Sequence, residues 1–246
     1  MKVDLIDYTG AGTLDPARRA ADVLVFTKNT RLTMSPEGLA AVGAKPWEEI
    51  ERELQYMART IPSSWEFVHY TFLIQGVTRA FTHQLVRTRT ASFAQQTMRV
   101  LPMQNWQYAE GPSVSSDENK RFTYESIMAD IATGYDDLLA KGVPIEDARG
   151  VLPTNILTNI VMGCSLRTLV ELVRKRSSPR TQSEYRDVLE AMKARARAAH
   201  PWLDIFLDRD KDRAAAELDA AIAGLEETSQ EVRTRMIKLV DELRKD

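Results

Sequence analysis

Two apolar segments, rich in aromatic and β-branched residues, constrain the fold most. They read EFVHYTFLIQGV (66–77) and TNILTNIVMG (154–163), and the stretch between them is mostly helical in pattern. Such a composition is typical of β-strands. Because helices dominate and the few strands lie far apart in the sequence, we expect a single α+β domain, with a central antiparallel-type sheet flanked by helices.

Local signals predict the other elements. VDLIDYTG (3–10) alternates and then breaks at glycine, which predicts a first strand. Asp15 and Pro16 are typical of a helix start. SLRTLVELVRKR (165–176) predicts an amphipathic helix, because its apolar residues recur at i, i+3, i+4 and i+7. Further helices are predicted within 35–60 (as two pieces), 78–87, 113–140, 144–153 and 180–206, and 92–111 is strand-like.

No repeat and no long flexible linker divides the chain, so residues 1–206 are expected to form one domain. Residues 207–246 are expected to form a C-terminal helical extension, which could pack on the body or on another subunit. The reason is that apolar residues recur at helical spacing over 211–244. These residues are Leu218, Ile222, Leu225, Val232, Ile237 and Val240.

Charge and cysteine content argue against several classes of protein. The 246 residues carry a net charge of −2 and a single cysteine, Cys164. Non-specific nucleic-acid binders are usually basic, so the net charge argues against that role, while a local basic patch stays possible. We also expect no specific nucleic-acid partner. One cysteine forms no intrachain disulfide, which suits a cytoplasmic location. We also expect no signal peptide, no membrane span and no metal site, because the sequence patterns for each are missing.

Residues 87–99, RTRTASFAQQTMR, contain three arginines and no acidic residue. Like charges repel one another, so such a cluster persists more readily beside an anion, and phosphate is the usual partner of planar guanidinium groups. The alternatives are a solvated turn and pairing with distant carboxylates. The side chains that could bind a ligand are Arg87, Thr88, Arg89, Thr90, Ser92, Gln95, Gln96, Thr97 and Arg99.

Three more arginines lie downstream, and each either binds a ligand or has a partner within the protein. Arg149 sits in EDARGVLP and is either a binding residue or a helix cap. Arg167 lies one turn before Glu171, as in an ordinary ion pair along a helix. Arg176 falls at the edge of the apolar stripe, where an arginine needs a partner or a ligand.

No nucleophilic constellation is visible. Cys164 has no histidine or asparagine context, so it is expected to be a structural thiol. His69 and His83 are expected to be structural histidines with satisfied hydrogen bonds. GxSxG, P-loop and GxGxxG motifs do not occur.

Read together, HQLVRTRTASFAQQTMR, EDARGVLP and SLRTLVELVRKR resemble the flavin-dependent thymidylate synthases over roughly residues 50 to 205. That family has a signature R-H-R-x7-S, whose positions here are Arg87, Thr88, Arg89 and Thr97. The resemblance implies a homotetramer with shared active sites. It also implies FAD reduced by NADPH, and transfer of the methylene of methylenetetrahydrofolate to C5 of a uracil nucleotide, with no cysteine nucleophile.

The resemblance also implies site residues, carried over position by position. Arg176 is expected at the uracil and Arg99 and Arg149 at the nucleotide phosphate, with Arg176 and Thr97 as catalytic candidates. The expected flavin-side residues are Glu66, Arg87, Thr88, Arg89, Thr90, Gln95, Ser165, Arg167 and Glu171. The expected nucleotide-side residues are Gln84, Gln95, Gln96, Thr97, Arg99, Arg149 and Arg176.

Several positions depart from the family pattern. Thr88 replaces the signature histidine and Thr97 the signature serine. Further departures are Ile61, Ala94, Val100, Ser165 and Glu171.

Three explanations compete for these departures: a divergent dUMP-specific thymidylate synthase, an inactive homologue that binds nucleotide or RNA, and an altered substrate. An inactive homologue would be expected to lose the phosphate arginines, which this chain keeps. We favour a C5-methylase of UMP and/or dUMP, similar to the uridylate methylase of polyoxin-type nucleoside-antibiotic biosynthesis, because changes near the sugar could admit a 2′-hydroxyl.

Overall fold

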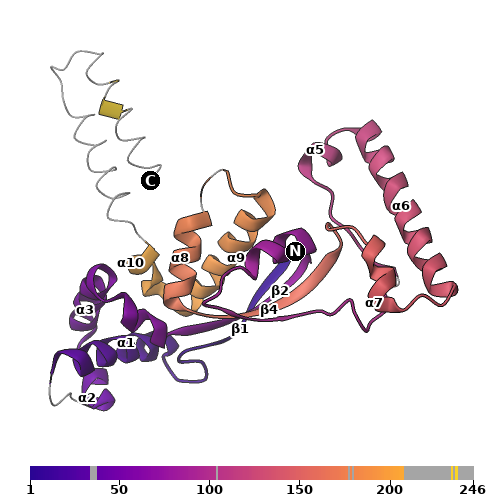
Figure 1. The fold of residues 1–246 in the computed structure, drawn as a ribbon. Coiled ribbons are helices and arrows are strands. Elements are labelled where there is room, and N and C mark those ends of the chain that lie inside the picture. Colours follow the sequence, from indigo (N-terminus) through magenta and orange to yellow (C-terminus); the bar gives the residue numbers. More distant parts are fainter. Residues whose placement is uncertain are drawn as a thin grey trace.

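Four strands form the centre of the computed structural model (Figure 1). They are β1 (Lys2–Tyr8), β2 (His69–Thr78), β3 (Ser92–Gln95) and β4 (Leu157–Ser165), in the order β1-β2-β4-β3. Every neighbouring pair is antiparallel. The two apolar segments that predicted strands are therefore the two central strands, paired as Ile74↔Ile160 and Phe72↔Met162. The predicted α+β domain with an antiparallel sheet is confirmed.

The structure describes residues 1–33, 38–103, 105–176, 178, 180–207, 234 and 236–237. Most of the predicted C-terminal extension, 207–246, lies outside the described residues. No helix in the described ranges is long and apolar enough to span a bilayer.

The helices are α1 (Pro16–Leu32), α2 (Leu39–Gly43), α3 (Trp47–Thr60), α4 (Arg79–Leu85), α5 (Pro112–Ser115), α6 (Glu118–Ala140), α7 (Ile145–Ala148), α8 (Leu166–Arg176), α9 (Ser183–Ala199) and α10 (Asp204–Leu207), with short 3-10 turns η1 (Pro62–Phe67), η2 (Arg149–Val151) and η3 (Pro201–Leu203).

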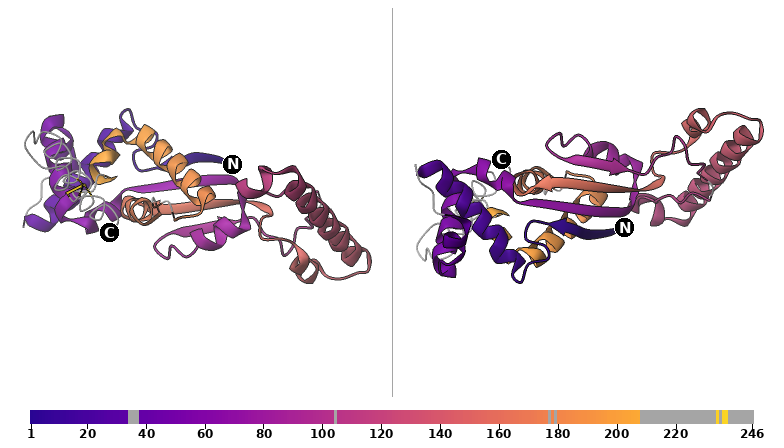
Figure 2. Two further views of the ribbon diagram at one scale, coloured as in Figure 1. Left: turned by 90° about the horizontal axis from the view of Figure 1, so that it is seen from above. Right: turned by 90° about the horizontal axis from the view of Figure 1, so that it is seen from below.

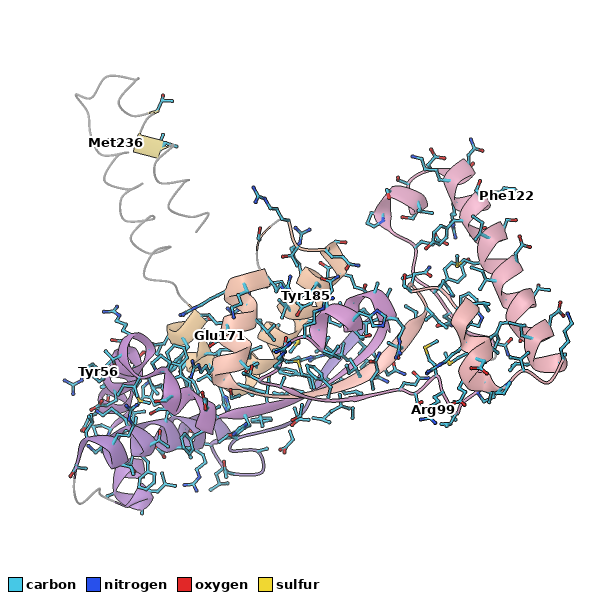
Figure 3. All side chains as sticks on the ribbon, viewed as in Figure 1. Tyr56, Arg99, Phe122, Glu171, Tyr185 and Met236 are labelled. Carbon is cyan, nitrogen blue, oxygen red and sulfur yellow. The ribbon has the colours of Figure 1, made fainter. Side chains whose placement is uncertain are left out.

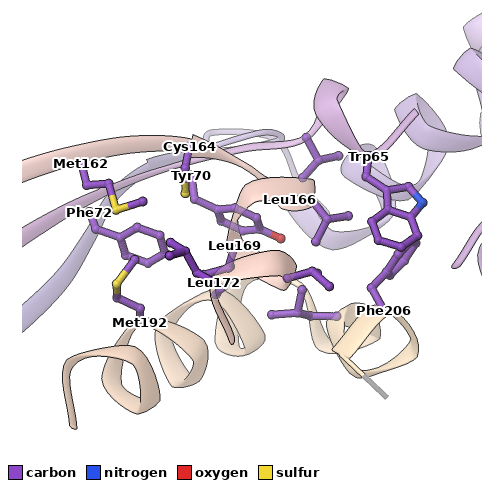
Figure 4. Packing of buried hydrophobic residues seen from close by; sticks show 14 of the residues in the cluster. Trp65, Tyr70, Phe72, Met162, Cys164, Leu166, Leu169, Leu172, Met192 and Phe206 are labelled. Carbon is purple, nitrogen blue, oxygen red and sulfur yellow. The ribbon is translucent and has the colours of Figure 1, made fainter. Parts of the chain in front are cut away.

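One face of the sheet is buried under α8 and α9 (Figure 2). Alternate residues of β2 and β4 point into this core, including Tyr70, Phe72 and Met162, where they meet Leu169 and Met192 (Figure 4). Burying these apolar side chains supplies the main drive for docking the helices, at roughly 1.5–3 kcal/mol for each large side chain. The opposite face, which carries Thr71 and Gly163, is only partly buried.

A buried histidine ties the end of the core to the first strand. The Nε2 atom of His200 lies 3.0 Å from the carbonyl oxygen of Thr9, and its Nδ1 lies 2.9 Å from the hydroxyl of Tyr70. A carbonyl only accepts, so Nε2 carries the proton and Nδ1 accepts from Tyr70. Burial lowers the pKa of His200 to about 4.

Residues 96–156 form an arm, with α5, α6 and α7, that lies beyond the end of the strands (Figures 1 and 2). Its base is closed by bonds between chain segments far apart in sequence. The backbone N–H of Gln96 donates to the carbonyl of Asn159 over 3.0 Å, and Tyr108 forms an antiparallel bridge with Ile156. The arm is therefore an insertion between two strands that are neighbours in the sheet.

Two predicted elements differ from the structure. The strand-like stretch 92–111 is a strand only over Ser92–Gln95, because beyond this point the chain leaves its partner β4 to enter the arm. The predicted single helix over 180–206 is broken after Ala199. Pro201 causes this break, since it has no N–H to donate and restricts the conformation of His200 before it.

Candidate active site

The arginine-rich turn after α4 is held against the start of α8. The hydroxyl of Thr168 lies 3.0 Å from that of Thr90 and 3.3 Å from its carbonyl oxygen. Arg87 and Arg89 lie on this turn, and both are exposed. Within the described part of the chain neither forms an ion pair, so the positive charge noted in the sequence is not neutralised by an acidic side chain there.

Beneath this turn lies a pocket of about 670 Å³, here called the sheet pocket. That volume falls within the range of about 300–1,000 Å³ usual for cofactor and small-molecule sites. Five of the residues predicted to lie on the flavin side line it: Glu66, Thr90, Ser165, Arg167 and Glu171. The remaining lining residues are His69, Tyr70, Thr71, Ser92, Gly163, Cys164 and Thr168.

Arg167 is the fixed cation of the sheet pocket. Its Nε lies 3.1 Å from Glu171 and its Nη1 lies 2.7 Å from Glu66, which comes from η1. These hydrogen bonds, first that of Glu171 and then that of Glu66, raise the pKa of Arg167. The ordinary ion pair expected from the sequence is thus present, and the contact with Glu66 brings a second carboxylate to the same rim.

Cys164 lines the sheet pocket in a setting that disfavours a nucleophilic role. It is a buried free thiol, and burial raises its pKa to about 12. The thiolate is therefore negligible at neutral pH. This agrees with the structural role expected from the sequence.

A second pocket, of about 470 Å³, lies between α4 and the base of the arm and is here called the arginine pocket. Arg79, His83, Glu146 and Arg149 line it, with Met98, Gly150, Leu152, Pro153, Thr154 and Ile156. Burial, and then the nearby charge of Arg149, lower the pKa of Arg79. Two guanidinium groups held close together at a pocket are suited to an anion.

Arg99 and Arg149, predicted to bind the nucleotide phosphate, both contact Glu146. The Nε of Arg99 lies 3.0 Å from the Glu146 carboxylate, and the Nε of Arg149 donates to the Glu146 carbonyl over 3.1 Å. Arg99 projects where the arm joins the body (Figure 3). The hydroxyl of Thr97 accepts from the backbone N–H of Arg99 over 3.1 Å. The structure therefore places Arg149 in the arginine pocket and pairs Arg99 with Glu146, another residue of its lining. Thr97 contacts only the backbone of Arg99 among the described residues and does not line the pocket.

Three predicted nucleotide-side glutamines bond to protein groups. Gln84 donates to Gln182 over 2.7 Å, and Gln95 donates to the hydroxyl of Thr82 over 2.8 Å. The side-chain carbonyl of Gln96 accepts from the amide of Asn159 over 3.1 Å. These contacts orient the three amides, and their expected role toward a nucleotide stays a prediction.

Arg176, the predicted uracil residue, lines neither of these two pockets. Its guanidinium lies 5.2 Å from the ring centre of Tyr185, within cation–π range. This aromatic ring is the partner that an arginine at the edge of the buried stripe needs. Thr88, which replaces the histidine of the family signature, lies near the hydroxyl of the same tyrosine.

Arg79 was not among the residues predicted for the site, and two histidines lie at positions that the sequence did not predict. Arg79 and His83 are one helical turn apart on α4 and both line the arginine pocket, a spacing that was visible in TRAFTHQLVR. His69 and His83 were expected to be satisfied structural histidines, but both are exposed, and His69 lines the sheet pocket. The buried, satisfied histidine is His200.

The chain is similar to a known protein family over most of its length. The family model described as thymidylate synthase complementing protein matches residues 5–202. A flavin-dependent thymidylate synthase of Nitratidesulfovibrio vulgaris is 36% identical over 169 residues, which cover 63% of this chain and 69% of the relative. One of Clostridium tetani is 29% identical over 221 residues, covering 82% and 85%. One of Geobacter sulfurreducens is 39% identical over 123 residues, covering 49% and 53%.

Proposed function

Because the chain belongs to the family of the flavin-dependent thymidylate synthases, we propose that it reductively methylates C5 of a uracil nucleotide. The family uses FAD, NADPH and methylenetetrahydrofolate, the cofactors and co-substrate expected from the sequence. When bound, the flavin supplies the hydride that completes the methyl group. The residues of this chain bind and orient the reactants.

The observation that carries this proposal is the composition of the sheet pocket. Its lining supplies hydroxyl groups from Thr90, Ser92, Ser165 and Thr168 together with the guanidinium of Arg167. These are donors that suit the hydroxyls and ring carbonyls of a flavin nucleotide. Arg87 and Arg89 on the adjoining turn, which form no ion pair within the described part of the chain, suit its diphosphate. The donor set therefore fits FAD.

The arginine pocket is proposed to hold the nucleotide phosphate. Arg149 and Arg99 were expected there, and Arg79 adds a third guanidinium near the same place. Phosphate would relieve the repulsion between Arg79 and Arg149 and compete with Glu146 for Arg99. Arg176 is proposed to stabilise negative charge on the pyrimidine carbonyls during attack by C5.

We propose that the substrate is UMP and/or dUMP. Thr88 and Thr97 stand where the family keeps histidine and serine, and changes of this kind near the sugar could give a 2′-hydroxyl space and a partner. A role in nucleoside-antibiotic biosynthesis belongs to this same proposal. The competing reading is a dUMP-specific thymidylate synthase of divergent sequence.

A homotetramer with shared active sites and a cytoplasmic location complete the proposal. Two observations support assembly. Arg176 lies apart from the sheet and arginine pockets, so a second subunit could complete the site. The arm also exposes large apolar side chains, Phe122 at 74% and Ile127 at 49% (Figure 3).

The test is a paired turnover assay with UMP and dUMP, using FAD, NADPH and methylenetetrahydrofolate, with the product identified by mass. A gain of one methyl group on UMP, or on both UMP and dUMP, is expected. Product from dUMP alone would support the dUMP-specific reading. If FAD binds and neither nucleotide is converted, methylation is excluded, and a salt titration with single-stranded RNA then tests the binding-protein alternative.

A further inference from the structure

The first turn of α9 contacts two parts of the candidate nucleotide site. Its first contact is made by Glu184, whose carboxylate receives two hydrogen bonds from Thr78. The backbone N–H of Thr78 donates over 2.7 Å and its hydroxyl donates over 2.6 Å. Thr78 caps α4, since its hydroxyl accepts from the N–H of Phe81 over 3.0 Å. Glu184 therefore fixes the residue from which α4 starts.

Two further backbone N–H groups at the start of α4 donate to carbonyl groups outside the helix. Arg79 donates to the carbonyl of Ile156 over 3.1 Å, and Ala80 donates to that of Thr154 over 2.8 Å. Both acceptors lie just before β4, so they set the start of α4 against the sheet, while Glu184 sets it against α9. The direction of α4 matters because it carries Arg79 and His83 into the arginine pocket.

The second contact is made by the next residue, Tyr185. Its ring packs 5.1 Å from that of Phe81 on α4 and 5.2 Å from the guanidinium of Arg176 at the end of α8. The side chain is fully buried, and its hydroxyl has no hydrogen-bond partner of normal geometry in the described part of the chain. Burial raises the pKa of this hydroxyl, while Arg176 and Thr88 act in the opposite direction. Tyr185 thus contacts α4 through its ring and lies beside Arg176, the predicted uracil residue.

We propose that Glu184 and Tyr185 are positioning residues that hold α4 and Arg176 in register, so that the phosphate and uracil ends of one nucleotide are bound together. This inference rests on the proposed function. Neither residue needs to touch the nucleotide. Glu184 acts through Thr78 and α4, and Tyr185 acts through the orientation of Arg176.

The test for Glu184 compares E184Q with E125Q, a control on α6 whose exposed carboxylate pairs with Arg121. In E184Q only the side-chain carbonyl oxygen can accept, so one of the two hydrogen bonds from Thr78 is lost and the other is no longer charge-assisted. We expect the Kd for dUMP to rise roughly tenfold, with FAD binding unchanged. Amide exchange over residues 79–86 should accelerate even without nucleotide. T78S keeps the hydroxyl and should behave like the wild type.

The test for Tyr185 compares Y185F, which removes the hydroxyl, with Y185L, which also removes the aromatic ring. We expect Y185L to lower kcat for methylation more than Y185F does, with thermal stability measured in parallel. Equal nucleotide affinity and equal exchange in E184Q and wild type would overturn the role of Glu184. A fall in kcat no larger than the accompanying fall in the folded fraction would overturn that of Tyr185. If the wild type itself binds no uracil nucleotide, the proposed function fails, whereas the exchange experiment still decides whether Glu184 holds α4.

Discussion

Glu66 and Arg167 are separated by 101 positions in the sequence, yet the Nη1 of Arg167 lies 2.7 Å from the carboxylate of Glu66 at the rim of the sheet pocket. The contact joins the turn before β2 to the helix after β4. It also holds the guanidinium between two carboxylates, since Glu171 occupies its other side. The orientation of Arg167 is thereby set before any ligand binds.

Glu66→Gln should weaken FAD binding, because Arg167 then loses one of the two groups that orient it. We expect the fraction of bound flavin, measured by absorbance after gel filtration, to fall several-fold. Glu125→Gln is the control, since Glu125 pairs with Arg121 in a similar exposed geometry on the arm. Full flavin retention in Glu66→Gln would remove this contact from the cofactor site.

Arg149→Ala should weaken nucleotide binding without lowering the stability of the folded protein. Removing this charge relieves Arg79 of a like charge but also removes the hydrogen bond from Arg149 to the Glu146 carbonyl, so the melting temperature of the ligand-free protein should change little. Nucleotide affinity should decrease by about 1–3 kcal/mol, the usual cost of a lost charge-assisted bond. Calorimetric titration with dUMP and a thermal melt measure the two effects, and unchanged affinity would place the phosphate elsewhere.

Thr88→His restores the family signature at a position close to the Tyr185 hydroxyl. We expect it to strengthen or rearrange flavin binding and to change the ratio of UMP to dUMP turnover. The measurements are a flavin titration and the paired assay. If flavin affinity and the substrate ratio both stay constant, position 88 takes no part in selecting the substrate.

Cys164→Ala should leave methylation largely intact, because a thiol with a pKa of about 12 supplies almost no thiolate at neutral pH. Iodoacetamide should label the folded wild-type protein very slowly and label its one cysteine quickly after unfolding. Loss of turnover in a folded Cys164→Ala variant would contradict the absence of a cysteine nucleophile.

His200 should make the folded protein less stable in acid. Its pKa is about 4 when folded against an ordinary value near 6.5, so the unfolded chain binds the extra proton first. The contribution is fully present above pH ~6.5 and is lost as the pH falls toward about 4, on the order of 3 kcal/mol in total. Urea unfolding of wild type and His200→Gln at several pH values measures the difference. The gap between them should narrow as the pH falls through this window, and a constant gap would show that His200 does not titrate.

Much of the fold follows from local patterns in the sequence. The strands β1, β2 and β4, the split between α2 and α3, and the amphipathic α8 were all predicted, because period and capping residues act within one element. The end of β3 was not, since the length of a strand depends on where its partner continues. Pro201 was visible in the sequence, but the apolar pattern around it led to the prediction of one continuous helix over 180–206.

The sequence predicted which residues belong to the candidate site better than it predicted which of them lie together. The family resemblance identified residues from η1, the arginine-rich turn before β3, β4 and α8, and the structure collects five of them in the sheet pocket. Arg79 was missed because nothing in its neighbourhood shows that Arg149, from the base of the arm, lies nearby. Likewise the protein partners of Gln84 and Gln95 come from contacts that only tertiary structure creates.

The arm leaves the sheet at Gln96 and returns beside the same point at Asn159. An insertion whose two ends are neighbours can change length without shifting the register of the strands on either side. Evolution can therefore alter the arm and the sheet independently. Relatives that share the sheet and the arginine-rich turn are free to differ in the arm, where a new subunit contact or a new wall for the nucleotide can arise without refolding the core.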